Sequence, residues 1–129
     1  MSARRPRGFT LLEMLVVLAL MALATGIALP RAAGWLDSVR ERGWRADLHA
    51  YLEAMPVRAF LSGQDVRLDA AAILAAVPDG PPGVQLHLPE PLTYSATGVA
   101  GGGRMQLLQR GAREVWVVEP ISGRVTEGR

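Results

Sequence analysis

The sequence predicts an α+β fold in which one long N-terminal helix packs on a small antiparallel β-sheet domain. Three observations lead to this class. The 129-residue chain opens with a near-continuous apolar run, continues in an amphipathic helical pattern, and ends in short alternating segments separated by glycine and proline. Because the strand segments follow one another without intervening long helices, antiparallel hairpins fit better than a parallel sheet with crossover helices.

The apolar run over residues 8–30 has the length of a membrane span. Leu11 to Leu29 is 19 residues, and a helix of that length rises ~28 Å, close to the hydrocarbon core of a bilayer. Arginines at positions 4, 5 and 7 precede the run and favour a cytoplasmic N-terminus. An ordinary secretory signal has an apolar region of only ~7–15 residues, so a permanent anchor or an assembly helix fits better than a discarded signal.

Glu13 is the one carboxylate inside this apolar run. An acidic residue at mid-bilayer costs roughly 2.5–3.5 kcal/mol on insertion scales, so it usually has a partner and a function. The alternative is that Glu13 reaches the interface, since it lies only one turn inside the segment.

The predicted second half of the helix covers residues 30–62. Pro30 is expected to kink the helix, and Pro56 to kink it again or to stop it, before Ser62 and Gly63 close the segment. Apolar residues recur at helical spacing between charged ones: Trp35, Leu36, Val39, Trp44, Leu48, Leu52 and Met55. This apolar stripe is expected to pack against the soluble domain. Alternatively, its two tryptophans contact neighbouring subunits. Trp35 also suits a membrane interface.

The remaining chain predicts short strands with one helical interruption. Asp69 is expected to N-cap a short helix over 70–77 that Pro78 stops. The expected strands cover residues 64–68, 84–88, 92–96, 104–109 and 115–119.

Composition and motifs argue against catalysis and nucleic-acid binding. The chain has no cysteine, so disulfides and thiolate metal sites are excluded. All 14 basic residues are arginine; three of them, at positions 4, 5 and 7, precede the apolar run, and the other 11 stand against 12 acidic residues, so no nucleic-acid surface is predicted. His49 and His87 lack paired-ligand spacing, and no serine lies in a nucleophile elbow. We expect no enzyme, no metal and no cofactor.

The N-terminal motif resembles the class III signal of type IV pilins and type II secretion pseudopilins. The stretch Arg7-Gly8-Phe9-Thr10-Leu11-Leu12-Glu13, followed by about twenty apolar residues, carries this resemblance. It implies that a membrane prepilin peptidase cuts after Gly8, that Phe9 becomes the N-methylated first residue, and that Glu13 serves subunit assembly. Pro30 also falls where the family has a proline that bends the helix.

Simple electrostatics agrees with the role that the resemblance implies for Glu13. A methylated amine at Phe9 keeps its positive charge and can reach Glu13 of a neighbouring subunit in a filament. Two unit charges ~4 Å apart attract by ~4 kcal/mol at an effective dielectric constant near 20, before desolvation is counted.

The C-terminal half is similar to the H-type minor pseudopilins. The resemblance rests on Tyr94 to Gly98, on Gly102 and Gly103 ahead of a strand, and on a closing turn at Ser122-Gly123-Arg124-Val125. The acidic calcium loop of the major, G-type pseudopilin has no counterpart in this sequence. A minor type IV pilin that primes or decorates an extracellular pilus is the alternative.

The resemblance implies a set of parts, partners and a location. Its parts are a cytoplasmic leader over 1–8, a transmembrane and filament-core helix over 9–29, the amphipathic continuation over 30–62 and a periplasmic β-rich domain over 63–129. Its partners are the peptidase and methylase, other major and minor pseudopilins, and the inner-membrane secretion platform. The protein would cross the inner membrane once, with its N-terminus cytoplasmic, and then join a periplasmic pseudopilus that supports protein export across the outer membrane.

Overall fold

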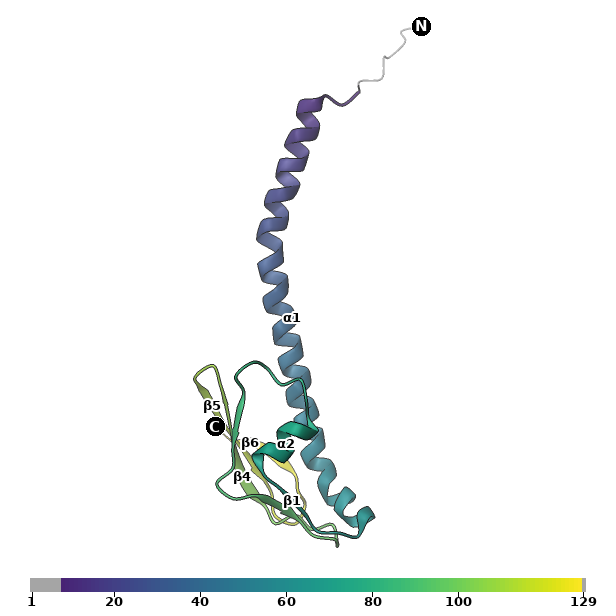
Figure 1. Ribbon diagram of the computed structural model, residues 1–129, viewed down its shortest axis with the longest axis vertical. Coiled ribbons are helices and arrows are strands. Elements are labelled where there is room, and N and C mark those ends of the chain that lie inside the picture. Colours follow the sequence, from purple (N-terminus) through teal and green to yellow (C-terminus); the bar gives the residue numbers. More distant parts are fainter. Residues whose placement is uncertain (1–7, 129) are drawn as a thin grey trace. The chain divides into compact units, whose positions relative to one another are not determined.

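The computed structural model describes residues 8–128, so the predicted leader lies outside the described residues except for Gly8. Two helices and six strands follow in the order α1, β1, α2, β2, β3, β4, β5, β6 (Figure 1). Their bounds are α1 Leu11–Ser62, β1 Val66–Leu68, α2 Ala70–Ala76, β2 Gln85–His87, β3 Leu92–Tyr94, β4 Gly103–Gln109, β5 Ala112–Val118 and β6 Val125–Gly128. The predicted α+β class is confirmed: a long N-terminal helix is followed by small antiparallel sheets.

The chain divides into two compact units, the first ending at Ser38 and the second beginning at Val39. The helical assignment of α1 continues through both Pro30 and Pro56, so the stop at Pro56 that the sequence left open does not occur. The kink at Pro30 stays a prediction, as do the functional boundaries drawn at residues 8, 29 and 62.

The part of α1 in the second unit supplies one wall of the core. Trp44, Leu48, Leu52 and Met55 are buried, as the predicted stripe requires. The Trp44 indole Nε1 also donates a hydrogen bond to the Val77 carbonyl at 3.0 Å. The earlier members of the stripe are different: in the first unit, Trp35 is 66% exposed. The domain is therefore seated by the stripe from Trp44 onward.

The short helix α2 begins where the sequence predicted. The Asp69 side chain accepts a hydrogen bond from the Ala72 amide at 2.8 Å, which is the bond expected of an N-cap residue. The helix ends at Ala76, and Ile73 is its buried residue. It fills the space between β1 and β2 and completes the core beside Trp44.

All strand pairs are antiparallel. β1 pairs with β3, and a four-stranded sheet has the order β2-β4-β5-β6. The β4–β5 hairpin turns at Arg110 and Gly111, whose φ angles of 48° and 80° both lie in the left-handed region, as in a type I′ turn. Strand β5 starts at Ala112, earlier than the predicted residue 115, because the tight turn lets pairing begin at once.

Strand β6 was not predicted, and contacts distant in sequence define it. It pairs with the last residues of β5. In addition, α1 binds both main-chain polar groups of Val125: His49 Nε2 is 3.1 Å from its carbonyl oxygen, and its amide donates to Glu53 Oε1 at 3.2 Å. The expected turn at Ser122 and Gly123 is present, and the residues after it form a short edge strand attached to the helix.

Tyr94 makes the stability of the second unit sensitive to alkaline pH. Its side chain is 1% exposed, and its hydroxyl has no hydrogen-bond partner among the described residues. Burial, and secondarily the charge of Tyr51, raises the pKa of Tyr94 to about 12. In the unfolded chain a tyrosine has a pKa of about 10, so above pH 10 the unfolded state loses the proton first and stability falls as the pH rises to 12.

We therefore expect the unfolding free energy of the full chain to fall by about 2–3 kcal/mol between pH 10 and 12. The chain has no lysine and only two tyrosines, so no other type of side chain loses a proton mainly in this interval. Tyr94→Phe should remove most of the fall and stabilise the protein by about 1 kcal/mol at pH 7. Chemical unfolding in neutral detergent, with Tyr51→Phe as control, measures both effects; an unchanged alkaline fall in Tyr94→Phe would contradict the assignment.

Candidate functional site

Three of the four residues singled out from the sequence lie at the N-terminal end of α1 or just before it: Gly8, Phe9 and Glu13. Gly8, Phe9 and Thr10 precede the helix in non-helical conformation, and α1 begins at Leu11. All three are exposed, and Phe9 is 79% exposed. The peptide bond between Gly8 and Phe9 is therefore in an open part of the described chain, just ahead of the first helical turn.

Thr10 and Glu13 form a reciprocal capping box that starts the helix. The Thr10 amide donates to Glu13 Oε2 at 3.0 Å, and the Glu13 amide donates to Thr10 Oγ1 at 3.2 Å. The Thr10 hydroxyl is also within 3.4 Å of Glu13 Oε2. These bonds satisfy amide groups that the first turn of a helix leaves without partners, and the carboxylate lies favourably at the positive end of the helix dipole.

The capping box gives Thr10 a role that our sequence analysis missed. The pattern Thr-x-x-Glu just before an apolar helix is a known sequence signal for such a box. In the structure, Oε2 accepts both bonds from Thr10, and no bond to Oε1 occurs among the described residues. One carboxylate oxygen thus holds the helix start while the other stays available to a cation.

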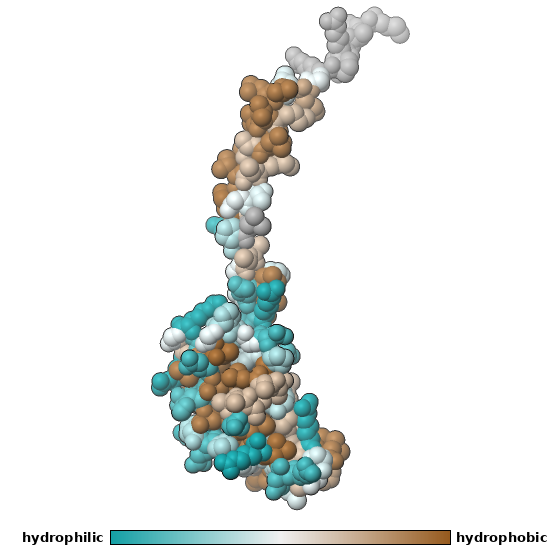
Figure 2. Space-filling model, viewed as in Figure 1, coloured by the Kyte–Doolittle hydropathy of each residue, from teal (hydrophilic) through white to brown (hydrophobic). Residues whose placement is uncertain are grey.

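Between the capping box and Pro30 the helix is apolar all round. α1 is long and apolar enough to cross a membrane by length and composition, and none of its most apolar stretch is buried in the structure. Figure 2 shows apolar side chains over the visible side of this part of the helix. A helix without a polar face requires a hydrophobic environment, either lipid or other helices. Pro30, the fourth predicted residue, lies far along the same helix, away from Glu13.

The second unit carries a polar network whose role is structural. The Arg45 guanidinium on α1 hydrogen-bonds Glu114 on β5 and lies 3.4 Å from Glu41 and 3.5 Å from Gln109 Oε1. The hydrogen bond to Glu114 is the largest cause that raises the pKa of Arg45. The network therefore holds a permanent positive charge that joins the helix to the sheet, beside a shallow cleft lined also by Leu107 and Ala112.

The two histidines are not brought together. His49 belongs to α1, where it lies against Val125, Glu53 and the edge of the Trp116 ring, whereas His87 is exposed on β2. Among residues 8–128, no three His, Asp or Glu side chains are grouped so as to hold a metal ion.

Comparison with known protein families gives a match that includes the N-terminal site. Residues 3–29 match the family described as the prokaryotic N-terminal methylation motif, so the chain carries the motif of type IV pilin-like proteins. The match implies processing by a prepilin peptidase and assembly with pilin-like subunits, and subunits of this kind are typically structural. The long helix and small antiparallel sheets agree with a pilin-like α+β fold. Searches among curated proteins and among solved structures found no match.

Proposed function

We propose that this protein is a minor pseudopilin of the H type in a type II secretion system. It would assemble into a periplasmic pseudopilus that supports export of folded proteins across the outer membrane. The observation that carries the proposal is the methylation motif over residues 3–29, with an exposed Gly8–Phe9 bond two residues before a capped apolar helix. The C-terminal resemblance to H-type subunits favours this subtype.

Maturation begins at the exposed N-terminal segment. The prepilin peptidase cuts after Gly8, removes the leader, and the new terminal amine of Phe9 is methylated. Because Gly8 to Thr10 are non-helical, the bond can enter an active site without unwinding α1. The apolar helix then remains on the mature chain as its inner-membrane anchor, with the C-terminal domain in the periplasm.

Assembly uses the same end of the helix. The methylated amine of Phe9 in one subunit pairs with Glu13 of its neighbour, and the apolar surfaces of the helices pack in the filament core. The capping bonds from Thr10 support this role, because they hold the Glu13 carboxylate at the helix start. Pairing then offsets the burial of both charges. Pro30 bends the helix at the end of the membrane segment.

The secretion assignment has a direct test. Deleting the gene should abolish export of secreted proteins across the outer membrane and leave pilus-dependent motility and DNA uptake intact. Loss of pili with normal export would instead assign the chain to a minor type IV pilin. Loss of neither phenotype, with an N-terminus starting near Thr25, would overturn both.

Glu13→Ala should reduce co-purification with other pilin-like subunits at least about tenfold, since the amine of the neighbour loses a pairing energy of more than about 1.4 kcal/mol. Glu13→Gln is the matched variant, because glutamine keeps a capping box but carries no charge. We expect it to be equally defective. Quantitative pull-down from membranes, after mass spectrometry has shown cleavage of both variants, measures the effect. Normal co-purification of Glu13→Gln would show that capping, and not charge, is what assembly needs.

A further inference from the structure

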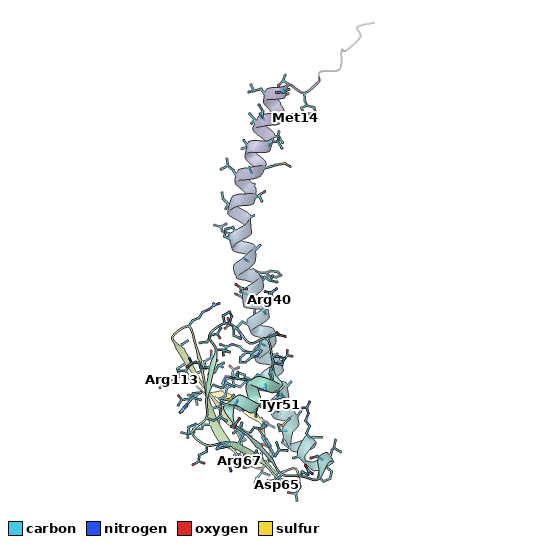
Figure 3. All side chains as sticks on the ribbon, in the orientation of Figure 1. Met14, Arg40, Tyr51, Asp65, Arg67 and Arg113 are labelled. Atoms are coloured by element: carbon cyan, nitrogen blue, oxygen red, sulfur yellow. The ribbon has the colours of Figure 1, made fainter. Side chains whose placement is uncertain are left out.

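The four-stranded sheet has a second face, directed away from α1. Side chains alternate between the two faces of a strand, and in β4 and β5 the inward set is buried against the helix: Met105, Leu107, Trp116 and Val118. The register places the alternate residues side by side on the other face, with Arg104 opposite Val117, Gln106 opposite Val115 and Leu108 opposite Arg113. We call these six residues the outer sheet face. Figure 3 shows Arg113 on the side of the sheet away from Tyr51 of α1.

The outer sheet face has an apolar centre and two cationic ends. Leu108, Val115 and Val117 are only half-buried, so they present apolar surface to solvent. Arg104 and Arg113 are exposed at opposite ends of the hairpin. Neither arginine forms an ion pair within the part of the chain that the structure describes, unlike Arg45 on the opposite side of the sheet.

The acidic residues of these strands are directed elsewhere. Glu114 faces the helix and binds Arg45, and Glu127 lies opposite Trp116 and so belongs to the helix side. Glu119 lies two residues after Val117, beyond the end of β5 and outside these six residues, and its Oε2 already accepts a hydrogen bond from the Ser122 hydroxyl at 3.2 Å. The outer sheet face therefore holds two arginines and no carboxylate.

We propose that the outer sheet face docks a different protein chain through an apolar patch flanked by carboxylates. Charge complementarity selects this occupant. A second copy would bring the same arginines and no carboxylate to a self-paired face, which disfavours a homodimer. A nucleic acid would gain only two phosphate contacts and would leave the apolar centre unmatched. The proposal concerns the second unit alone and does not depend on N-terminal processing.

Site-specific photo-crosslinking of the full chain in its own membrane tests the proposal. A photoreactive benzoylphenylalanine replaces Gln106 at the centre of the face, and mass spectrometry identifies the crosslinked segment. We expect an acidic segment of another protein. The yield should fall about tenfold when Arg104→Glu and Arg113→Glu are combined, because two attractive pairs become repulsive. Arg67→Glu, an exposed substitution on β1 of the other sheet, is the matched control and should change the yield less than about twofold.

A charge swap makes the result decisive. Arginine in place of the carboxylates of the crosslinked segment should restore the yield to the Arg104→Glu/Arg113→Glu variant. Binding of the full chain in neutral detergent to poly-L-glutamate and to duplex DNA gives an independent measurement. Poly-L-glutamate should bind more tightly than duplex DNA. The Arg104→Glu/Arg113→Glu variant should bind poly-L-glutamate about tenfold more weakly than the unchanged chain does. Crosslinks to a second copy, a yield unaffected by charge reversal, or tighter binding of DNA would overturn the proposal. Circular dichroism checks that the variants fold, as expected for exposed positions.

Discussion

Alanine in place of Gly8 is expected to leave the leader on the chain and so to abolish both processing and function. The proposed peptidase must accommodate the residue before the cut, and a glycine there presents no side chain. We expect cleavage to slow at least about a hundredfold, equivalent to a barrier higher by about 2.7 kcal/mol. N-terminal mass spectrometry of protein from membranes measures the ratio of uncut chain to chain starting at methylated Phe9.

The structure has room for the added methyl group, so the substitution is expected to affect cleavage without disturbing the fold. A Cβ added at Gly8 meets no atom of residues 10–128 within 4 Å, and Gly8 lies outside α1, so this substitution gives the described fold no reason to change. Gly26→Ala is the matched control, because Gly26 is equally open but lies within the helix. It should be processed normally. Efficient cleavage of the Gly8→Ala chain would contradict the proposed maturation and favour a membrane-tethered protein that uses α1 only as an anchor.

The second large effect is expected at Gly123, where the loop before β6 meets the helix. Gly123 has φ +71°, and a Cβ placed there would lie 2.6 Å from Pro56 Cγ and 3.4 Å from Ala100 Cβ. Alanine therefore suffers both a left-handed backbone, about 1–2 kcal/mol, and overpacking, about 1–3 kcal/mol. Together we expect Gly123→Ala to destabilise the second unit by about 2–5 kcal/mol.

A second glycine separates these two causes. Gly111 has φ +80° in the β4–β5 turn, but nothing lies within 4 Å of its added Cβ, so Gly111→Ala should lose only about 1–2 kcal/mol. In a Pro56→Ala background, Gly123→Ala should recover part of its loss, because the clashing Cγ is gone. Unfolding of the full chain in detergent, followed by tryptophan fluorescence, measures all four variants. Equal losses at Gly111 and Gly123 would show that backbone strain alone matters.

Local patterns predicted much of the fold because local forces decide those parts. Asp69 caps α2 through a bond three residues away, and the buried stripe from Trp44 to Met55 follows helical periodicity. The capping box at Thr10 and Glu13 was equally local and equally readable. Its signal coincides with another at the same residue, because Glu13 is also the one carboxylate in the apolar run.

The parts that could not be predicted depend on partners distant in sequence. Pro56 lies within a continuous helix and its ring packs close to Gly123, a contact that nothing near Pro56 in sequence indicates. Strand β6 is short and weakly patterned; it forms because β5 pairs with it and because His49 and Glu53 bind the main chain of Val125. Trp35 and Trp44 look alike in the sequence but belong to different units: Trp44 is buried and donates to the Val77 carbonyl, whereas Trp35 is exposed.

The sequence by itself therefore determined the class of protein: an apolar helix that starts beside a processing motif, followed by a small strand-rich domain. Periodicity, capping and motif spacing are properties of neighbouring residues, so they can be read along the chain. The tertiary structure alone decided how α1 joins the sheet and which side chains are left on its outer face. These depend on register and close packing between segments as far apart as Pro56 and Gly123, whose meeting no local preference encodes.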